Sequence, residues 1–186
     1  EVTKLPEYKR SQMIGRVFQD PMAGTAPTMT IEENLAMAYS RNKKRRLRIG
    51  VDKKRRELFR TSLETLHLNL ENRLNAKVGM LSGGERQALS LLMATFTQPS
   101  ILLLDEHTAA LDPARAELIT NLTKQLVEKD KLTTLMITHN MQQAARISDY
   151  TGFFYLGKLI EYDKTKKIFE NPKEELTEKY MTGRFG

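Results

Sequence analysis

Residues 81–87 read LSGGERQ and residues 101–106 read ILLLDE, and these two stretches decide the fold. Ile101–Leu104 is a continuous apolar run, which is typical of a parallel strand buried on both faces. Before it, Gly83-Gly84 opens an apolar segment with helical character that continues to the break at Pro99. A helix followed by a buried strand predicts an α/β layered fold with parallel strands.

The alternation of strand and helix continues downstream. Asp112 followed by Pro113 predicts an N-cap and a first-turn proline, opening a helix that lasts to about residue 129. After it we expect a strand at 133–138, a helix at 140–147, a pair of strands at 153–156 and 159–162 turned at Gly157-Lys158, and a polar helical tail from Thr165.

Upstream of the glycine pair, three elements are expected. Met13–Phe18 is a short apolar run that predicts a strand, and Gln19 begins the loop after it. Thr30 and Glu33 have the spacing of a capping box and predict a helix start. A further helix is expected from about Lys53 to Leu68.

Composition narrows the class of protein. The 186 residues are 40% hydrophobic and 28% charged, which fits a soluble globular protein. No apolar run approaches the roughly 20 residues of a membrane span, and no signal peptide is evident, so we expect an intracellular protein. Zero cysteines exclude disulfides and thiolate sites, and three histidines are too few for a histidine metal cluster. The chain begins with Glu, which suggests a fragment or a processed product.

The net charge of +7 comes from one window, Arg41–Arg60, which carries 11 Lys or Arg against two acidic residues. A solvated face is the ordinary explanation of such a window. Contact with anionic lipid headgroups or with nucleic acid stays open as an alternative. Only Phe59 supplies an aromatic ring inside the window, so stacking of bases on it is not expected.

Two carboxylates, Asp105 and Glu106, end the predicted buried strand. Open α/β sheets bind ligands beyond the carboxyl ends of their strands, so both acids are expected to face a ligand crevice. There Asp105 is suited to hold Mg²⁺, directly or through water, and Glu106 to orient or deprotonate an attacking water. Ser82, Gly83 and Gly84 open the preceding helix, where free N–H groups and the helix dipole favour a phosphate.

The order and spacing of LSGGERQ (81–87), ILLLDE (101–106), AALD (109–112) and ITH (137–139) resemble the ATP-binding subunits of ABC transporters, and Gln19 in VFQDP matches the Q-loop of that family. The resemblance covers essentially the whole chain. It implies a partial P-loop NTPase fold of the ABC type, with a parallel sheet core and an inserted helical subdomain. It also implies three segments: a core remnant with the Q-loop (1–24), the helical subdomain ending in the signature helix (25–97), and the second half of the core with the helical tail (98–186).

The resemblance also implies roles for single residues. Asp105 would assist Mg²⁺, Glu106 would act on the water, and His139 would hydrogen-bond the γ-phosphate. Gln19 would sense Mg²⁺ and the water. Ser82, Gly83 and Gly84 would touch ATP held by a second nucleotide-binding subunit, and Asp112 would communicate across that dimer. The implied ligands are ATP and Mg²⁺.

Two departures from the family pattern stand out. His107 occupies a position where the family usually has proline, which alters the loop and leaves the carboxylates in place. No G-x-x-x-x-G-K-S/T phosphate loop occurs, since the only Gly-Lys pair, Gly157-Lys158, is followed by Leu159. We therefore expect that the chain starts downstream of its P-loop segment and that it is inactive alone.

The two ends of the chain resemble different members of the family. Residues 1–137 are similar to ATPases of uncharacterised solute importers, and residues 138–186 are similar to the ATPase of the phosphate importer. A crossover between two homologous genes, natural, engineered or an assembly artefact, would produce such a join.

The function expected from the sequence is therefore ATP hydrolysis that powers solute import, with transmembrane permease subunits as partners, at the cytoplasmic face of the plasma membrane. Phosphate import is the alternative within the family. A soluble ABC ATPase acting on nucleic acid or ribosomes is the alternative from another class, but such proteins usually carry two cassettes or long insertions, so no nucleic acid is expected here. A catalytically inactive fragment is the third alternative.

Overall fold

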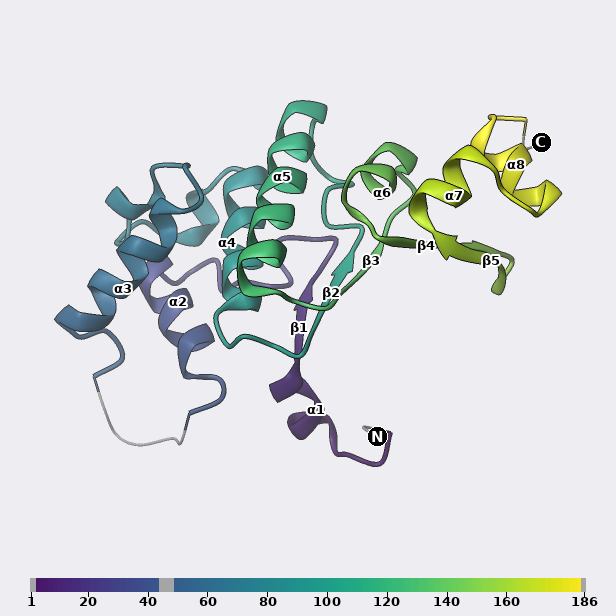
Figure 1. Cartoon of the computed structure of the whole chain (residues 1–186). Helices are drawn as coiled ribbons and strands as arrows, with labels where there is room; N and C mark the ends of the chain where they lie inside the picture. The colour runs from purple at the N-terminus through teal and green to yellow at the C-terminus, as the bar shows by residue number, and fades with distance from the viewer. Residues whose placement is uncertain (1–2, 44–48, 185–186) are drawn as a thin grey trace. The chain divides into compact units, whose positions relative to one another are not determined.

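The computed structural model describes residues 3–43 and 49–184. It divides into two compact units, residues 1–137 and residues 138–186 (Figure 1). The boundary between the units falls at residue 138. The crossover and the three segments (1–24, 25–97 and 98–186) remain predictions.

The first unit is built on a parallel sheet of three strands in the order β1-β2-β3. These strands are β1 (Ile14–Val17), β2 (Ile101–Asp105) and β3 (Thr134–Ile137). Val17 pairs with Leu104, and Asp105 pairs with Ile137, so the carboxyl ends of the three strands share one edge. The predicted α/β architecture with a parallel sheet is confirmed.

Helices α4 (Gly83–Thr95) and α5 (Pro113–Asp130) pack side by side in the same unit (Figure 1). Helix α4 packs directly on β1. A Cβ atom added to Gly15 of β1 would stand only 2.7 Å from the carbonyl oxygen of Ala94 in α4. The sheet face that carries Gly15 also carries Val17, Leu102 and Leu104, all buried. Burial of this apolar face is the main force that holds α4 on the sheet.

The remaining helices of the first unit are α1 (Glu7–Met13), α2 (Ile31–Ser40), α3 (Lys53–Glu64) and the short 3-10 turns η1 (Leu70–Asn72) and η2 (Val78–Met80). The rings of Tyr39, Phe59 and Phe96 meet edge to face, with centroids 5.9 to 6.0 Å apart, and join α2 and α3 to the end of α4. These helices share one hydrophobic core with the sheet.

The second unit contains α6 (Met141–Ile147), the antiparallel pair β4 (Tyr150–Tyr155) and β5 (Lys158–Lys164), and the helices α7 (Thr165–Glu170) and α8 (Glu175–Met181). The hairpin turns at Leu156-Gly157, one residue earlier than predicted. Both turn residues have positive φ, 47° and 76°, which a two-residue turn of the I′ type requires.

Several expectations about the strands and helices need correction. The predicted burial of β2 on both faces is wrong, because Ile101 is 40% exposed and Leu103 only half-buried. Leu135 and Ile137, on the same face of the sheet, are 60% and 56% exposed. Within the described residues of the first unit, therefore, helices cover only one face of the sheet. The helix from Lys53 ends at Glu64 rather than near residue 68, because the chain turns at His67, which has a φ of 54°.

No helix among residues 3–43 and 49–184 is long and apolar enough to cross a membrane.

Candidate functional site

Three of the predicted site residues meet where β1 and β2 end. Gln19 follows β1, Asp105 is the last residue of β2, and Glu106 follows it. The carboxamide Nε2 of Gln19 lies 3.5 Å from Oε2 of Glu106, at the limit of a hydrogen bond. The structure thus brings together an amide and two adjacent carboxylates, as expected from the carboxyl edge of a parallel sheet.

The backbone at Glu106 has an unusual conformation, with a φ of 40°. A non-glycine residue in the left-handed region is uncommon and carries strain unless its surroundings hold it there. The Glu106 N–H donates to the Ile137 carbonyl at 2.9 Å, and the Glu106 carbonyl accepts from the Ala109 N–H at 2.9 Å. These two bonds fix the turn that aims the carboxylate.

Asp105 forms an ion pair with Arg16 of β1, with Nη2 of the guanidinium 3.2 Å from Oδ2 of the carboxylate. Both side chains are about half exposed, so water and salt weaken this attraction. Arg16 also lies over the Phe18 ring, 4.6 Å from its centroid. No sequence pattern predicted this pairing, because the partners lie 89 residues apart in the chain.

The second predicted group lies at the start of α4. Ser82 is the N-cap and forms a complete capping box: its hydroxyl accepts from the Glu85 N–H at 3.3 Å, and its own N–H donates to the Glu85 carboxylate at 2.7 Å. Burial acts to raise the pKa of Glu85, but the bonds from Ser82 and the ion pair with Arg73 outweigh it, so this pKa lies below its usual value.

Arg115 connects Asp112 to the start of α4. Asp112 caps α5 by accepting from the Arg115 N–H at 3.1 Å and pairs with the Arg115 guanidinium at 3.2 Å. The Arg115 side chain packs on Gly84, where an added Cβ would stand 3.2 Å from its Cδ. Gly83 is exposed at the helix start. The structure therefore brings Ser82, Gly83, Gly84 and Asp112 into one neighbourhood.

Gln87 was not predicted as a site residue, yet it connects the site at the strand ends with the start of α4. Its side chain is fully buried on α4, and its Nε2 donates to the Phe18 carbonyl at 3.2 Å, directly before Gln19. Close packing supports the same connection, because a Cβ on Gly24 would lie 2.5 Å from the Ser90 hydroxyl of α4. The signal in the sequence was a polar residue on the apolar face of a helix.

His107, the departure from the family pattern, is buried and only 1% exposed. Its Nε2 lies 3.1 Å from the Thr123 hydroxyl of α5. Burial lowers the pKa of His107 from 6.5 to about 4, because the charged imidazolium would lose its water. The ring is therefore neutral at physiological pH.

His139 belongs to the second unit, where it is exposed just before α6. Next to it, Thr138 accepts the Asn140 N–H at 3.0 Å and donates to Gln143 at 2.8 Å, which holds the loop before the helix.

The donor set at the strand ends fits a magnesium ion with nucleotide phosphates. Mg²⁺ is usually held by one or two carboxylates while phosphates and water fill its other positions, and Asp105 and Glu106 supply two carboxylates. Among the described residues no group of three or more His, Asp or Glu forms a cage that would hold a metal by protein ligands alone. The site therefore suits a metal that arrives with a phosphate ligand.

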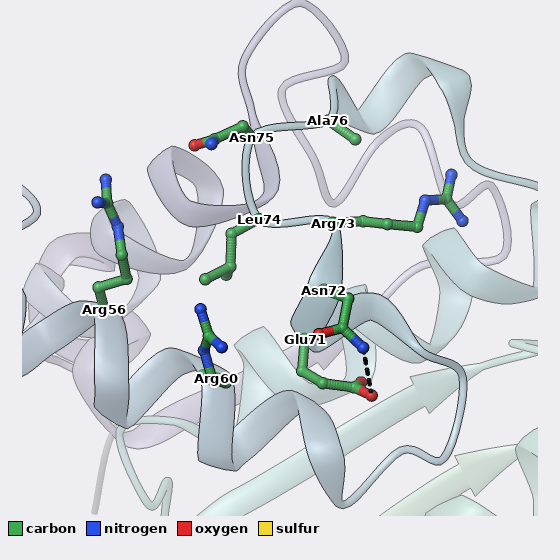
Figure 2. Close-up of a pocket in the computed structure, with 8 residues that line it drawn as sticks. All are labelled: Arg56, Arg60, Glu71, Asn72, Arg73, Leu74, Asn75 and Ala76. Carbon is green, nitrogen blue, oxygen red and sulfur yellow. Dashed lines mark hydrogen bonds between the residues drawn. The ribbon is translucent and has the colours of Figure 1, made fainter.

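A separate cavity of about 490 Å³ lies beside α3 and contains none of the predicted site residues (Figure 2). It is lined by Arg56, Arg60 and the segment 71–76. Arg56 is already paired with Glu32 at 2.8 Å, and Arg73 with Glu85 at 2.6 Å. Of the two arginines that the window 41–60 brings to this cavity, Arg56 is therefore neutralised by Glu32. Residues 44–48 of the window lie outside the described residues.

Known proteins that resemble the chain identify its family. Residues 1–109, more than half of the chain, match the family described as "ABC transporter". The chain is 42% identical over 179 residues to a tyrosine transport ATP-binding protein of Clostridioides difficile, covering 96% of this chain and 71% of the relative. It is 43% identical to the phosphate import ATP-binding protein PstB 1 of Ligilactobacillus salivarius, covering 98% of this chain and 66% of that relative. The chain thus spans about two thirds of the length of these relatives.

Solved structures agree on the fold. The dimeric ATP-binding cassette MJ0796, in a post-hydrolysis state bound to ADP and Pi, matches with a TM-score of 0.70 and 27% identity over 87% of this chain and 68% of its own. CbiO1 of Clostridium perfringens, part of the transporter complex cbiONQ, matches with a TM-score of 0.72 and 22% identity over 86% of this chain and 60% of its own. Sequence and fold agree, and the chain belongs to the ATP-binding proteins of the ABC transporter family.

Proposed function

We propose that this chain is the ATP-binding subunit of an importer, working as one of two nucleotide-binding subunits beneath transmembrane permease subunits at the cytoplasmic face of the membrane. Relatives at 42% and 43% identity that carry the names of transport ATPases support this proposal. The observation that carries it is the meeting of Gln19, Asp105 and Glu106 at the carboxyl ends of β1 and β2.

The catalytic steps assigned to Asp105 and Glu106 follow from their chemistry, and those assigned to Gln19 and His139 follow from the family resemblance. Bound Mg²⁺ would neutralise phosphate charge during phosphoryl transfer, with Asp105 as its protein ligand. In a site completed by a P-loop, Glu106 would accept a proton from the attacking water or orient it, and Gln19, whose amide lies next to Glu106, would hold that water or the metal's water shell. His139 would donate a hydrogen bond to the γ-phosphate.

The start of α4 serves the nucleotide of the other subunit. The exposed Gly83, the N–H groups behind it and the helix dipole favour an anion at this end. Ser82 adds its hydroxyl, and Asp112, joined to the same end through Arg115, lies where a signal can cross to the other subunit.

A homodimer of these 186 residues would contain two copies of the 81–87 signature segment and no G-x-x-x-x-G-K-S/T sequence. Positioning and charge neutralisation supply most of the catalysis of phosphoryl transfer, and the P-loop provides both. The chain alone is therefore expected to hydrolyse no ATP. Paired with a complete subunit, its Ser82 end would close over the partner's ATP, whereas its own Glu106 would not be used.

The test is to mix the chain with a complete ATP-binding subunit that carries a P-loop and whose own serine at the position of Ser82 has been changed to Arg. Added wild-type chain should restore turnover. Ser82→Asp keeps a good N-cap but places a carboxylate against the phosphate, so it should restore none. Thr30→Asp makes a comparable change at the capping box of α2 and should restore turnover fully.

Glu106→Gln in the chain should also restore turnover. Loss of the restored activity in Glu106→Gln, together with full activity of Ser82→Asp, would reverse the assignment of the two half-sites. Mg-ATP hydrolysis by the chain alone that disappears in Glu106→Gln would overturn the expectation of inactivity.

Tyrosine and phosphate are the two candidate solutes, because phosphate import ATP-binding proteins match 93% to 98% of the chain at about the same identity as the tyrosine transport ATP-binding protein. Co-purification distinguishes the two candidates. Membranes that carry the permease for the chain's own solute, tyrosine or phosphate, should retain the chain. Membranes that carry the permease for the other solute should release it on washing.

A further inference from the structure

The imidazole of His107 joins the turn after β2 to the body of α5. Its Nε2 reaches the Thr123 hydroxyl, 16 residues further along the chain, at 3.1 Å. Its Nδ1 is buried and has no hydrogen-bond partner among the described residues. The ring therefore makes one hydrogen bond, and that bond connects two separate elements.

The surroundings of Thr123 decide which ring nitrogen carries the proton. The Thr123 hydroxyl donates its single hydrogen to the Ile119 carbonyl at 2.8 Å, so its oxygen acts as the acceptor toward His107. Nε2 must then carry the hydrogen. The other tautomer would bury an Nδ1–H donor without an acceptor, and such orphaned donors are rarer in proteins than under-used acceptors.

The residue immediately before His107 is Glu106, whose backbone is held in the left-handed region. The Ile137 carbonyl holds the Glu106 N–H, the Ala109 N–H holds the Glu106 carbonyl, and the His107 side chain ties the next residue to α5. If the bond from His107 to Thr123 were lost, the two backbone bonds alone would have to hold the strained turn, which would then relax toward an unstrained φ and carry the Glu106 carboxylate away from Gln19.

We propose that His107 is a positioning residue: its imidazole, with a hydrogen on Nε2 bonded to Thr123, holds Glu106 in the conformation that keeps its carboxylate within reach of Gln19. The catalytic importance of Glu106 rests on the proposed function, whereas the tautomer and the strained turn do not.

The test uses the complete 186-residue chain with ¹⁵N-labelled histidine, which gives signals from only three residues. The His107 signals, identified by their loss in His107→Gln, should show hydrogen on Nε2 and a bare Nδ1. Thr123→Val removes the acceptor with little change of shape. It should shift the ring toward a mixture of tautomers and move the ¹³Cα resonance of Glu106 away from its left-handed value.

Thr120→Val is the matched control, because Thr120 is also buried on α5 and also donates to a carbonyl one turn back. It should leave the ring and the Glu106 resonance unchanged. His107→Gln retains an N–H donor and should preserve the Glu106 resonance, whereas His107→Leu should not. This pair of variants answers the question even if Thr123→Val fails to fold.

A hydrogen on Nδ1 in the wild-type chain would overturn the proposal, as would a Glu106 resonance that stays in place in both Thr123→Val and His107→Leu. None of these measurements involves ATP. Their failure is therefore distinguishable from failure of the half-site assignment, which the mixing assay tests by turnover.

Discussion

Arg16 of β1 reaches across the sheet edge to Asp105 of β2, with Nη2 and Oδ2 3.2 Å apart. The carboxylate that we assign to Mg²⁺ is therefore engaged by a cation of the same chain. The pair is about half exposed, and exposed ion pairs contribute at most about 1 kcal/mol to stability. A divalent metal that arrives with phosphate can replace so weak a partner.

The coupling between Arg16 and Asp105 should accordingly be small and sensitive to salt. In a double-mutant cycle with Arg16→Gln and Asp105→Asn, we expect a coupling free energy below about 1 kcal/mol that shrinks further in 1 M NaCl, roughly the concentration at which the Debye length falls to 3 Å. Urea unfolding of the four proteins measures it. A coupling above about 2 kcal/mol would mean that Arg16 holds Asp105 too firmly to be exchanged for a metal.

Gly15 should be far less tolerant of a methyl group than Gly50. Gly15→Ala places a Cβ 2.7 Å from the Ala94 carbonyl oxygen, so α4 must move off the sheet, and we expect a loss of about 1–3 kcal/mol. Gly50→Ala meets nothing within 4 Å and should change stability by less than about 0.5 kcal/mol. Thermal or urea unfolding compares them. Equal stability of the two variants would contradict the close packing of α4 on β1.

Stability should fall in acid partly because of His107. Its pKa is about 4 in the folded chain and 6.5 in its ordinary state, so between these values the unfolded chain binds more protons. As far as His107 is concerned, the free energy of unfolding is therefore highest above pH 6.5. It falls as the pH falls toward 4, by about 3 kcal/mol in total. His107→Gln should remove this part of the pH dependence of unfolding, and His67→Gln should retain it. Identical pH profiles for wild type and His107→Gln would refute the burial argument.

The open face of the sheet should make the chain associate. Leu135 and Ile137 are 60% and 56% exposed beside the half-buried Leu103, and contiguous apolar surface of this kind drives self-association. We expect the double variant Leu135→Thr, Ile137→Thr to sediment with less concentration dependence than wild type. The control changes two isolated exposed residues, Ile49→Thr and Met80→Thr, which are 77% and 76% exposed. A wild-type chain that is strictly monomeric at high concentration would contradict this expectation.

Local signals in the sequence predicted local structure well. The capping box at Thr30 and the N-cap at Asp112 form as expected, because each depends on residues within one helical turn. The helix start at Gly83-Gly84 was also predicted, but the capping box that Ser82 forms there was not. The strand that ends in Asp105 was also predicted, and the family resemblance is confirmed.

The features that the sequence could not predict depend on distant partners. Exposure of Ile101 depends on what covers one face of the sheet, which its own apolar pattern does not encode. The bond from His107 to Thr123 and the bond from Gln87 to Phe18 each join separate elements across the core. Helix α1 and the 3-10 turns are too short to produce a periodic pattern.

The bond from Gln87 to the Phe18 carbonyl also determines how a displacement of the start of α4 is transmitted. Little more than one helical turn separates Ser82 from Gln87. In the proposed arrangement, a displacement of the helix start by the nucleotide of another subunit would reach the main chain before Gln19 with no loop between them to absorb it. The Phe18 carbonyl is a backbone group and stays in place when Phe18 is substituted, so substitution of Gln87 is the change that would alter this link between the two proposed nucleotide sites.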